Sequence, residues 1–267
     1  MAGAGLALCS RQVEDPFMEM KNRSTLALAA CLALVSVAVA RAEQSRKPAV
    51  IVTQDGEVDD RSSFVRLILY TPDIDLRGVV ATNSKWQRNG HGLGWINEVY
   101  ELYGQVRENL LLHNPDYPTV ERLKSLTVLG NEDPKHLTGG APYVDTAGSE
   151  LIVEELRRIE DELLHITCWG GMNTAAQALW RFRNDYPEAY ELKASQVRVF
   201  AIDFQDEAGD WLVKAMPEIR VVRCNGFHMT WNYHSPEKPL EHNPYPLLMS
   251  DRWLDQNIKK GHGPLGA

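Results

Sequence analysis

The sequence predicts an α/β protein with a doubly wound, mainly parallel sheet and helices on both faces. Two observations predict this class. Short apolar runs alternate with segments of helical periodicity, and no repeat or low-complexity linker interrupts the chain after residue 48. Strands that alternate with helices pair in parallel, because each helix carries the chain back across the sheet. The predicted strands are residues 49–53, 76–82, 163–168, 197–202 and 219–224.

The predicted helices lie between those strands, where apolar side chains recur at the three- and four-residue spacing of one helix face. Pro72, Pro187 and Pro217 follow three of them and mark their ends, because proline cannot continue a helix. The segment 114–148 is rich in proline, glycine and aspartate, so we predict a long loop with one helix near residues 119–126. The helices are residues 62–70, 94–104, 149–162, 173–184 and 206–216.

The composition excludes a nucleic-acid partner. The chain has 267 residues, of which 44% are hydrophobic and 24% charged, as is ordinary for a soluble globular protein. The net charge is −8 and no basic cluster offsets it, so attraction to a phosphate backbone is not available. This length suits one large α/β domain or two small ones. Assembly into a homo-oligomer stays an open alternative.

Residues 1–42 are predicted to be an N-terminal extension and a signal peptide. Lys21 and Arg23 precede an apolar run of small residues, 25–40, and Ala-Arg-Ala at 40–42 fits a signal-peptidase site. The run is too short for a confident membrane span, so we expect no integral span after cleavage before Glu43. The mature chain is therefore expected to be exported, to the periplasm or the extracellular space.

Two alternatives for this segment stay open. A buried N-terminal helix is disfavoured by the polar stretch 43–48, which follows the apolar run directly. A lipoprotein modified at Cys31 is disfavoured because the apolar run continues long after that residue.

Polar side chains follow four of the predicted strands at one edge of the sheet. The carboxyl ends of parallel strands meet at the same edge, and ligands bind there where the strand order reverses. The sequence therefore predicts a ligand site at this edge. The residues concerned are 55–60 after the first strand, 83–87 after the second, 169–174 after the third and 203–207 after the fourth.

The acidic loop after the first strand predicts a bound cation. It reads Asp55-Gly56-Glu57-Val58-Asp59-Asp60, and Gly56 allows a turn tight enough for the carboxylates to converge. Clustered carboxylates raise one another's pKa unless a cation is present. Calcium fits an all-oxygen site, whereas magnesium would favour a phosphate-binding loop and zinc would require histidine or cysteine. The alternative is a solvated turn with a helix cap.

Four segments also carry a resemblance to a known family. They are DGEVDDRSSFVRLILY, GVVATNSKWQ, CWGGMNTAAQAL and the run that ends in GHGPLGA. The first looks like the Asp-x-x-x-Asp-Asp signature of the inosine-uridine preferring nucleoside hydrolases. Taken in order, the four resemble the nucleoside hydrolase-like domain of exported cellulose-binding proteins, and the resemblance covers about residues 49–267.

The resemblance implies roles for the matching residues. Asp55, Asp59 and Asp60 would bind calcium together with the main-chain carbonyl of Trp169. Asp55 would also be the catalytic base that takes a proton from the attacking water. The reaction would break a carbon–nitrogen bond at the anomeric carbon of a sugar, and the acidic rim would stabilise an oxocarbenium-like transition state.

Six rim residues are predicted to contact the substrate. The resemblance places three of them, Asn83, Asp203 and Gln205, in loops that hold sugar hydroxyls. Trp86 lies in a rim loop, where its ring is available to stack on a sugar or a base. For Asn173 the alternative is a helix cap. The full set is Glu57, Asn83, Trp86, Asn173, Asp203 and Gln205.

The chain departs from the family's pattern in three ways. Thr53 stands where the nucleoside hydrolases often have an aspartate, and Glu57 stands where they have a glycine. The family also takes an aspartate ligand from further along the chain, and the residues after Gly226 offer no match. We therefore expect the domain, residues 43–267, to be truncated at its C-terminus.

These observations lead to one main hypothesis and two alternatives. The main hypothesis is an exported, calcium-dependent hydrolase of N-glycosidic, nucleoside-type or related glycosyl bonds. The first alternative is a polysaccharide-binding protein, with cellulose as its partner, that has the same fold and no turnover. The second is a purely structural exported domain, which leaves the carboxylate cluster unexplained.

Overall fold

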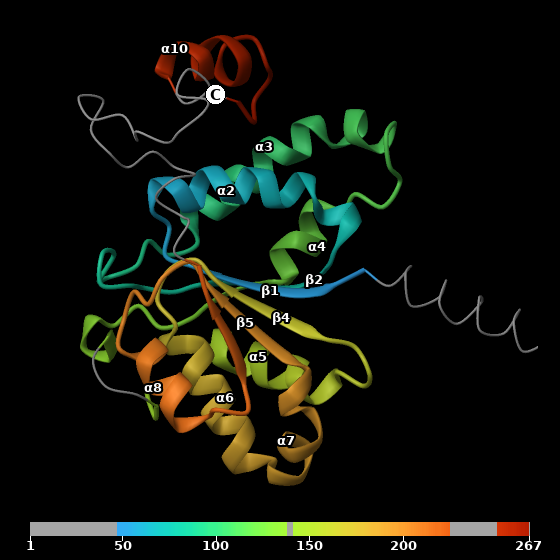
Figure 1. Cartoon of the computed structure of the whole chain (residues 1–267). Coiled ribbons are helices and arrows are strands. Elements are labelled where there is room, and N and C mark those ends of the chain that lie inside the picture. The colour runs from blue at the N-terminus through green and yellow to red at the C-terminus, as the bar shows by residue number, and fades with distance from the viewer. Residues whose placement is uncertain (1–46, 138–140, 225–249, 267) are drawn as a thin grey trace, which may run out of the picture. The chain divides into compact units, whose positions relative to one another are not determined.

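The computed structural model describes residues 47–137, 141–224 and 250–266. These residues form one sheet of six parallel strands in the order β3-β2-β1-β4-β5-β6, which confirms the predicted doubly wound fold (Figure 1). The predicted signal peptide lies outside the described residues. The strands are β1 (Ala49–Gln54), β2 (Asp75–Ala81), β3 (Thr127–Leu129), β4 (Leu164–Cys168), β5 (Val197–Ala201) and β6 (Arg220–Arg223).

Helices cover both faces of this sheet (Figure 1). One face carries α2 (Val58–Leu69), α3 (Gly94–Leu111) and α4 (Val120–Ser125). The other carries α5 (Ala147–Arg158), α6 (Asn173–Asp185), α7 (Pro187–Lys193) and α8 (Ala208–Ala215). Near the end of the chain, α10 (Asp251–Leu254) continues into a π-helical turn, Asp255–Lys259. Short 3-10 helices occur at Thr71–Asp73, Pro134–Leu137 and Ala194–Gln196.

The central strand β1 is buried along nearly its whole length, which explains its continuous apolar run, Ala49 to Val52. Successive side chains of a strand point to opposite faces, so Val79 and Val80 of β2 enter different apolar clusters. Val79 packs in the cluster of α2, α3 and α4, where Phe64 and Trp95 meet edge to face with ring centroids 5.3 Å apart. Val80 packs with residues such as Ile152 of α5.

The strand order reverses between β1 and β4 in the middle of the sheet. The two strands pair in parallel with Thr53 opposite Cys168, so the chain leaves both strands at neighbouring points. On its other side β1 pairs with β2, where Gln54 lies opposite Ala81. Ligands bind at such a reversal in open α/β sheets, and the acidic loop begins there.

Among the strands and the α-helices that cover the sheet, the sequence prediction missed β3 and α7. The strand β3 and its pairing with β2 fall inside the segment predicted as a long loop, although the helix predicted there is present as α4. Three residues are too few to show strand alternation. The helix α7 begins at Pro187, which was interpreted only as a stop. Proline suits the first position of a helix because that N–H has no intrahelical partner.

Some predicted boundaries were also wrong. The helix α2 begins at Val58 and not at residue 62, so Asp59 and Asp60 lie in its first turn. Acidic side chains stabilise this end of a helix because the free N–H groups carry partial positive charge. The helix α3 runs seven residues beyond its predicted end, to Leu111, and α5 ends four residues early, at Arg158.

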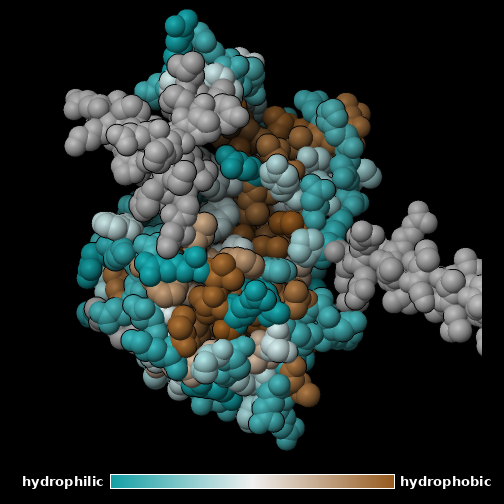
Figure 2. All heavy atoms as spheres, in the orientation of Figure 1, coloured by the Kyte–Doolittle hydropathy of each residue, from teal (hydrophilic) through white to brown (hydrophobic). Residues whose placement is uncertain are grey.

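Apolar side chains also reach the surface. Figure 2 shows several such patches on the viewed face. Phe200 of β5, Val222 of β6 and Val213 of α8 are among the exposed large apolar residues. Within the described residues, none of the helices is both long and apolar enough to cross a membrane.

Candidate functional site

The acidic loop folds back on itself at the end of β1. One carboxylate oxygen of Asp60, Oδ2, accepts hydrogen bonds from the backbone N–H groups of Asp55 (2.7 Å) and Gly56 (3.1 Å). Gly56 has φ +78°, a left-handed conformation that side chains other than glycine rarely adopt. A Cβ atom there would also lie 2.9 Å from Cβ of His91. The glycine therefore lets the first turn of α2 return its carboxylates to the strand end.

The three aspartates of this loop are almost completely buried. Asp55 and Asp60 are each 2% exposed and Asp59 is 5% exposed. Burial, and then the negative charge of Asp55, raises the pKa of Asp60 to about 9. Adjacent buried carboxylates repel each other, so this group is stable only with a proton or a cation among them.

Two carboxylate oxygens in the loop, Oδ2 of Asp55 and Oδ1 of Asp59, are buried without a hydrogen-bond partner among the described residues. Leaving a buried polar atom unpaired costs about 1–3 kcal/mol, and more when it is charged. Carboxylate oxygens are the donors that calcium prefers, so the set fits this ion. Across the described part of the chain, however, no group of three or more histidine, cysteine, aspartate or glutamate side chains is arranged as a metal site. Neutral oxygens are therefore needed to complete a cation shell.

The loop after β4 carries the neutral oxygen that was predicted to be a ligand, the backbone carbonyl of Trp169. The N–H of Trp169 donates to the carbonyl of Thr53 (2.9 Å), which joins the ends of β4 and β1. The carbonyl of Trp169 accepts from Nε2 of Gln205 (2.7 Å). Gly170 packs directly on Asp55, since a Cβ atom at this glycine would lie 2.7–2.9 Å from the Asp55 side chain. The carbonyl predicted to bind metal thus lies in a segment that contacts the acidic loop.

A network of buried amides lies beside these loops. The side-chain oxygen of Asn83 accepts from Nδ2 of Asn131 (3.1 Å) and from Nδ2 of Asn173 (2.9 Å). Asp206 accepts from both the backbone N–H and Nδ2 of Asn173, at 2.9 and 3.0 Å. Burial raises the pKa of Asp206 to about 6, although these hydrogen bonds oppose the shift. The network ties together the segments that follow β2, β3, β4 and β5.

Comparisons with known proteins agree with this arrangement. A family described as "Cellulose-binding Sde182, nucleoside hydrolase-like domain" matches residues 49–267. The chain belongs to this family. A search of curated proteins found no significant match.

A solved structure is similar to this member of the nucleoside hydrolase-like family. It is of a nucleoside hydrolase-related hypothetical protein from Saccharophagus degradans that is associated with carbohydrate metabolism. The two chains share 28% identity with a TM-score of 0.67, and the match covers 82% of this chain. It covers 50% of the other, so the chain spans half the length of that protein.

In this nucleoside hydrolase-like domain the predicted site residues fall into three groups. Asp55, Asp59, Asp60 and the Trp169 carbonyl come from adjoining loops at one edge of the sheet, with Gln205 bonded to that carbonyl. Their roles in binding calcium and in catalysis stay predictions.

The second group is buried. Asn83 and Asn173 are both fully buried, and their side chains are hydrogen-bonded within the amide network. Asn173 is the first residue of α6 and makes no side-chain cap, so the alternative interpretation as a helix cap was wrong. In the structure the amides of Asn83 and Asn173 hold the loops together. Their contact with sugar hydroxyls stays a prediction.

The third group, Glu57, Trp86 and Asp203, is more exposed to solvent than the other two groups. Glu57 is half-buried, and burial raises its pKa, although the hydrogen bond from Nε2 of Gln87 (3.3 Å) opposes the rise. Trp86 is 65% exposed, with the ammonium of Lys85 5.1 Å from its ring centroid. Asp203 is bound by the guanidinium of Arg223, at 2.7 Å from Nε.

Sequence reasoning missed two members of the amide network, Asn131 and Asp206, as candidate site residues. Asn131 follows β3, the strand that was predicted as loop, so its place at the strand edge could not be inferred. Asp206 was noted at the end of β5, but Asp203 was preferred there. The turn after β5 brings Asp206 inward, where the N–H of Ala208 donates to it at 3.1 Å.

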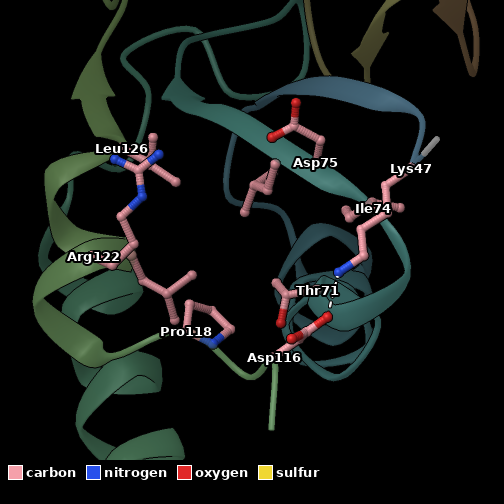
Figure 3. A pocket seen from close by; sticks show the side chains of 10 residues that line it. Lys47, Thr71, Ile74, Asp75, Asp116, Pro118, Arg122 and Leu126 are labelled. Atoms are coloured by element: carbon pink, nitrogen blue, oxygen red, sulfur yellow. Dashed lines mark hydrogen bonds and ion pairs between the residues drawn. The ribbon is translucent and has the colours of Figure 1, made fainter. Parts of the chain in front are cut away.

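A pocket of about 290 Å³ lies at the opposite end of the sheet (Figure 3). Lys47, which precedes β1, forms an ion pair there with Asp116 (2.6 Å), and Arg122 of α4 lies on the pocket wall. Asp75, the first residue of β2, also lines it. Since the acidic loop follows the other end of β1, this pocket is separate from the candidate site.

Proposed function

We propose that the chain is an exported, calcium-dependent hydrolase of N-glycosidic, nucleoside-type bonds or related glycosyl bonds. One observation carries the proposal. Three aspartates are buried together at the end of the central strand β1, and oxygens of Asp55 and Asp59 have no partner among the described residues. A purely structural turn would expose these carboxylates or pair them, because unpaired buried charge is costly.

The proposed chemistry assigns separate tasks to Asp55 and Asp60. A calcium ion, when bound, supplies positive charge that lowers the pKa of water and orients it. Asp55 accepts a proton from the water while the oxygen of the water bonds to the anomeric carbon. The carbon–nitrogen bond breaks at the same time, and its electron pair leaves on nitrogen. Asp60 holds the turn by binding the N–H groups of Asp55 and Gly56. The negative rim stabilises the positive charge that develops on the sugar.

The comparisons support a substrate that contains a sugar. The family description names both cellulose binding and a nucleoside hydrolase-like domain, and the similar protein from Saccharophagus degradans is associated with carbohydrate metabolism. A sugar is the component common to nucleosides and polysaccharides. We therefore propose a nucleoside or a glycan as the small-molecule partner.

Removal of calcium tests this function directly. The purified full chain is incubated with a panel of N-ribosides and aryl glycosides, and release of reducing sugar is measured. We expect release that stops on chelation and returns with excess calcium, because the buried carboxylates need the ion to keep their charge. Release that is indifferent to chelation, or absent with every substrate of the panel, would contradict the proposal.

One observation favours a second function, binding of polysaccharide without turnover. Trp86 is 65% exposed on the rim, and the loop that carries it is joined to the acidic loop by the hydrogen bond from Gln87 to Glu57. An exposed indole costs free energy in water and offers a flat apolar face, which suits stacking on a sugar ring.

The Trp86→Ala variant tests the binding function. We expect its retention on insoluble cellulose to fall about tenfold, the effect of losing about 1.4 kcal/mol of stacking. The matched control is Tyr70→Ala, which removes an aromatic ring that is 57% exposed at the far end of α2. Equal retention of the two variants would show that Trp86 is not a sugar platform.

A further inference from the structure

Gln205, which is bonded to the loop after β4, has a side-chain oxygen that is unpaired within the described residues. The residue is 5% exposed, and its Nε2 donates to the carbonyl of Trp169 at 2.7 Å. A carbonyl only accepts hydrogen bonds, so this contact determines which end of the amide is nitrogen. The other end, Oε1, is buried and has no partner among the described residues.

The amide of Gln205 is connected to the acidic loop through the segment Trp169-Gly170. Trp169 precedes Gly170, and a Cβ atom at Gly170 would lie 2.9 Å from Oδ2 of Asp55, the same oxygen that lacks a partner. The backbone of Gln205 is held in turn, because its carbonyl accepts from the N–H of Lys85 at 2.7 Å. Gln205 therefore brings a neutral oxygen from the end of β5 toward the ends of β1 and β4.

A single ligand would satisfy these oxygens together. Oδ2 of Asp55, Oδ1 of Asp59 and Oε1 of Gln205 are all buried and unpaired. Calcium accepts about six to eight oxygen ligands and combines carboxylates with amide and backbone carbonyls. A neutral amide adds a ligand without adding negative charge to a loop whose carboxylates already repel one another.

We propose that Oε1 of Gln205 is a ligand of the cation that the acidic loop binds. This inference rests on the proposed calcium dependence, but it assigns Gln205 a role other than binding sugar hydroxyls. The competing role is positioning alone, in which Gln205 only holds the Trp169 carbonyl through Nε2. The two roles use opposite ends of one amide, so two substitutions separate them.

Calorimetric titration of the chelator-treated full chain with calcium tests the proposal. We expect Gln205→Met, which keeps the shape and removes both polar atoms, to weaken calcium binding by about tenfold or more. We expect Gln205→Glu to bind within about threefold of the unchanged chain, or more tightly, because it keeps an oxygen ligand and adds charge. Thermal unfolding of each metal-free variant verifies that it is folded.

The matched control is Gln196→Met. Nε2 of Gln196 also donates to a backbone carbonyl at 2.7 Å, that of Glu160, but the residue precedes β5 at the other end of the sheet. Its calcium affinity should not change. If both Gln205 variants bind calcium equally weakly, Gln205 only positions Trp169. If neither variant differs in calcium affinity from the unchanged chain, Gln205 has no part in binding. Either result overturns the inference, whereas an unchanged chain that takes up no calcium refutes the proposed function itself.

Discussion

The Asp55→Asn variant should lose turnover by about 10³-fold or more and keep its fold. Asparagine has the shape of aspartate but cannot take a proton from water, and general bases contribute about 10²–10⁴-fold. It also removes a negative charge that the cation would balance. Within the described residues, the Asp55 carboxylate accepts just one backbone hydrogen bond, a long one of 3.3 Å from the N–H of Glu57, so little structure depends on it. Sugar release and calorimetric calcium titration measure the two losses.

Without calcium, the Asp55→Asn variant should be at least as stable as the unchanged chain. Removing the charge of Asp55 relieves the repulsion that raises the pKa of Asp60, so the midpoint of thermal unfolding without calcium should stay level or rise. The control is Asp116→Asn, an exposed carboxylate paired with Lys47 at the opposite end of the sheet, which should keep turnover. An Asp55→Asn variant with a tenth or more of normal turnover would exclude Asp55 as the base.

The Gly170→Ala variant should weaken calcium binding by about tenfold or more and lower the free energy of unfolding by about 1–3 kcal/mol. A Cβ atom at this position would lie 2.7, 2.8 and 2.9 Å from Cβ, Cγ and Oδ2 of Asp55, closer than real contacts allow. The methyl group must therefore displace either the carboxylate or the segment that carries the Trp169 carbonyl. Calorimetric titration and denaturant unfolding measure the two effects.

Gly94→Ala is the matched control for that variant. Gly94 begins α3, and a Cβ atom there would meet nothing within 4 Å. Alanine at this position should leave calcium binding unchanged and stabilise the helix by less than about 1 kcal/mol. If Gly170→Ala behaved like Gly94→Ala, the contact between the loop after β4 and Asp55 would not matter for the site.

Much of the fold could be predicted because the signals are local. The patterns of β1, β2, β4 and β5 and of the amphipathic segments between the strands extend over five or more residues each. Three residues of β3 are too few for such a signal, and Pro187 both follows α6 and begins α7. These failures occur where one local pattern is compatible with two structures.

The sequence alone determined that a parallel sheet brings the polar residues after its strands to one edge, with Asp55, Asp59 and Asp60 in a single loop. It determined this because the alternation of strands with helices, and the burial of the apolar runs, follow from periodicity. Only the tertiary structure decided which polar side chains turn inward. Asp206 is buried against Asn173 and Asp203 is bound by Arg223, because contacts between distant segments set the direction of each side chain. A sequence pattern within one segment does not predict contacts with distant segments.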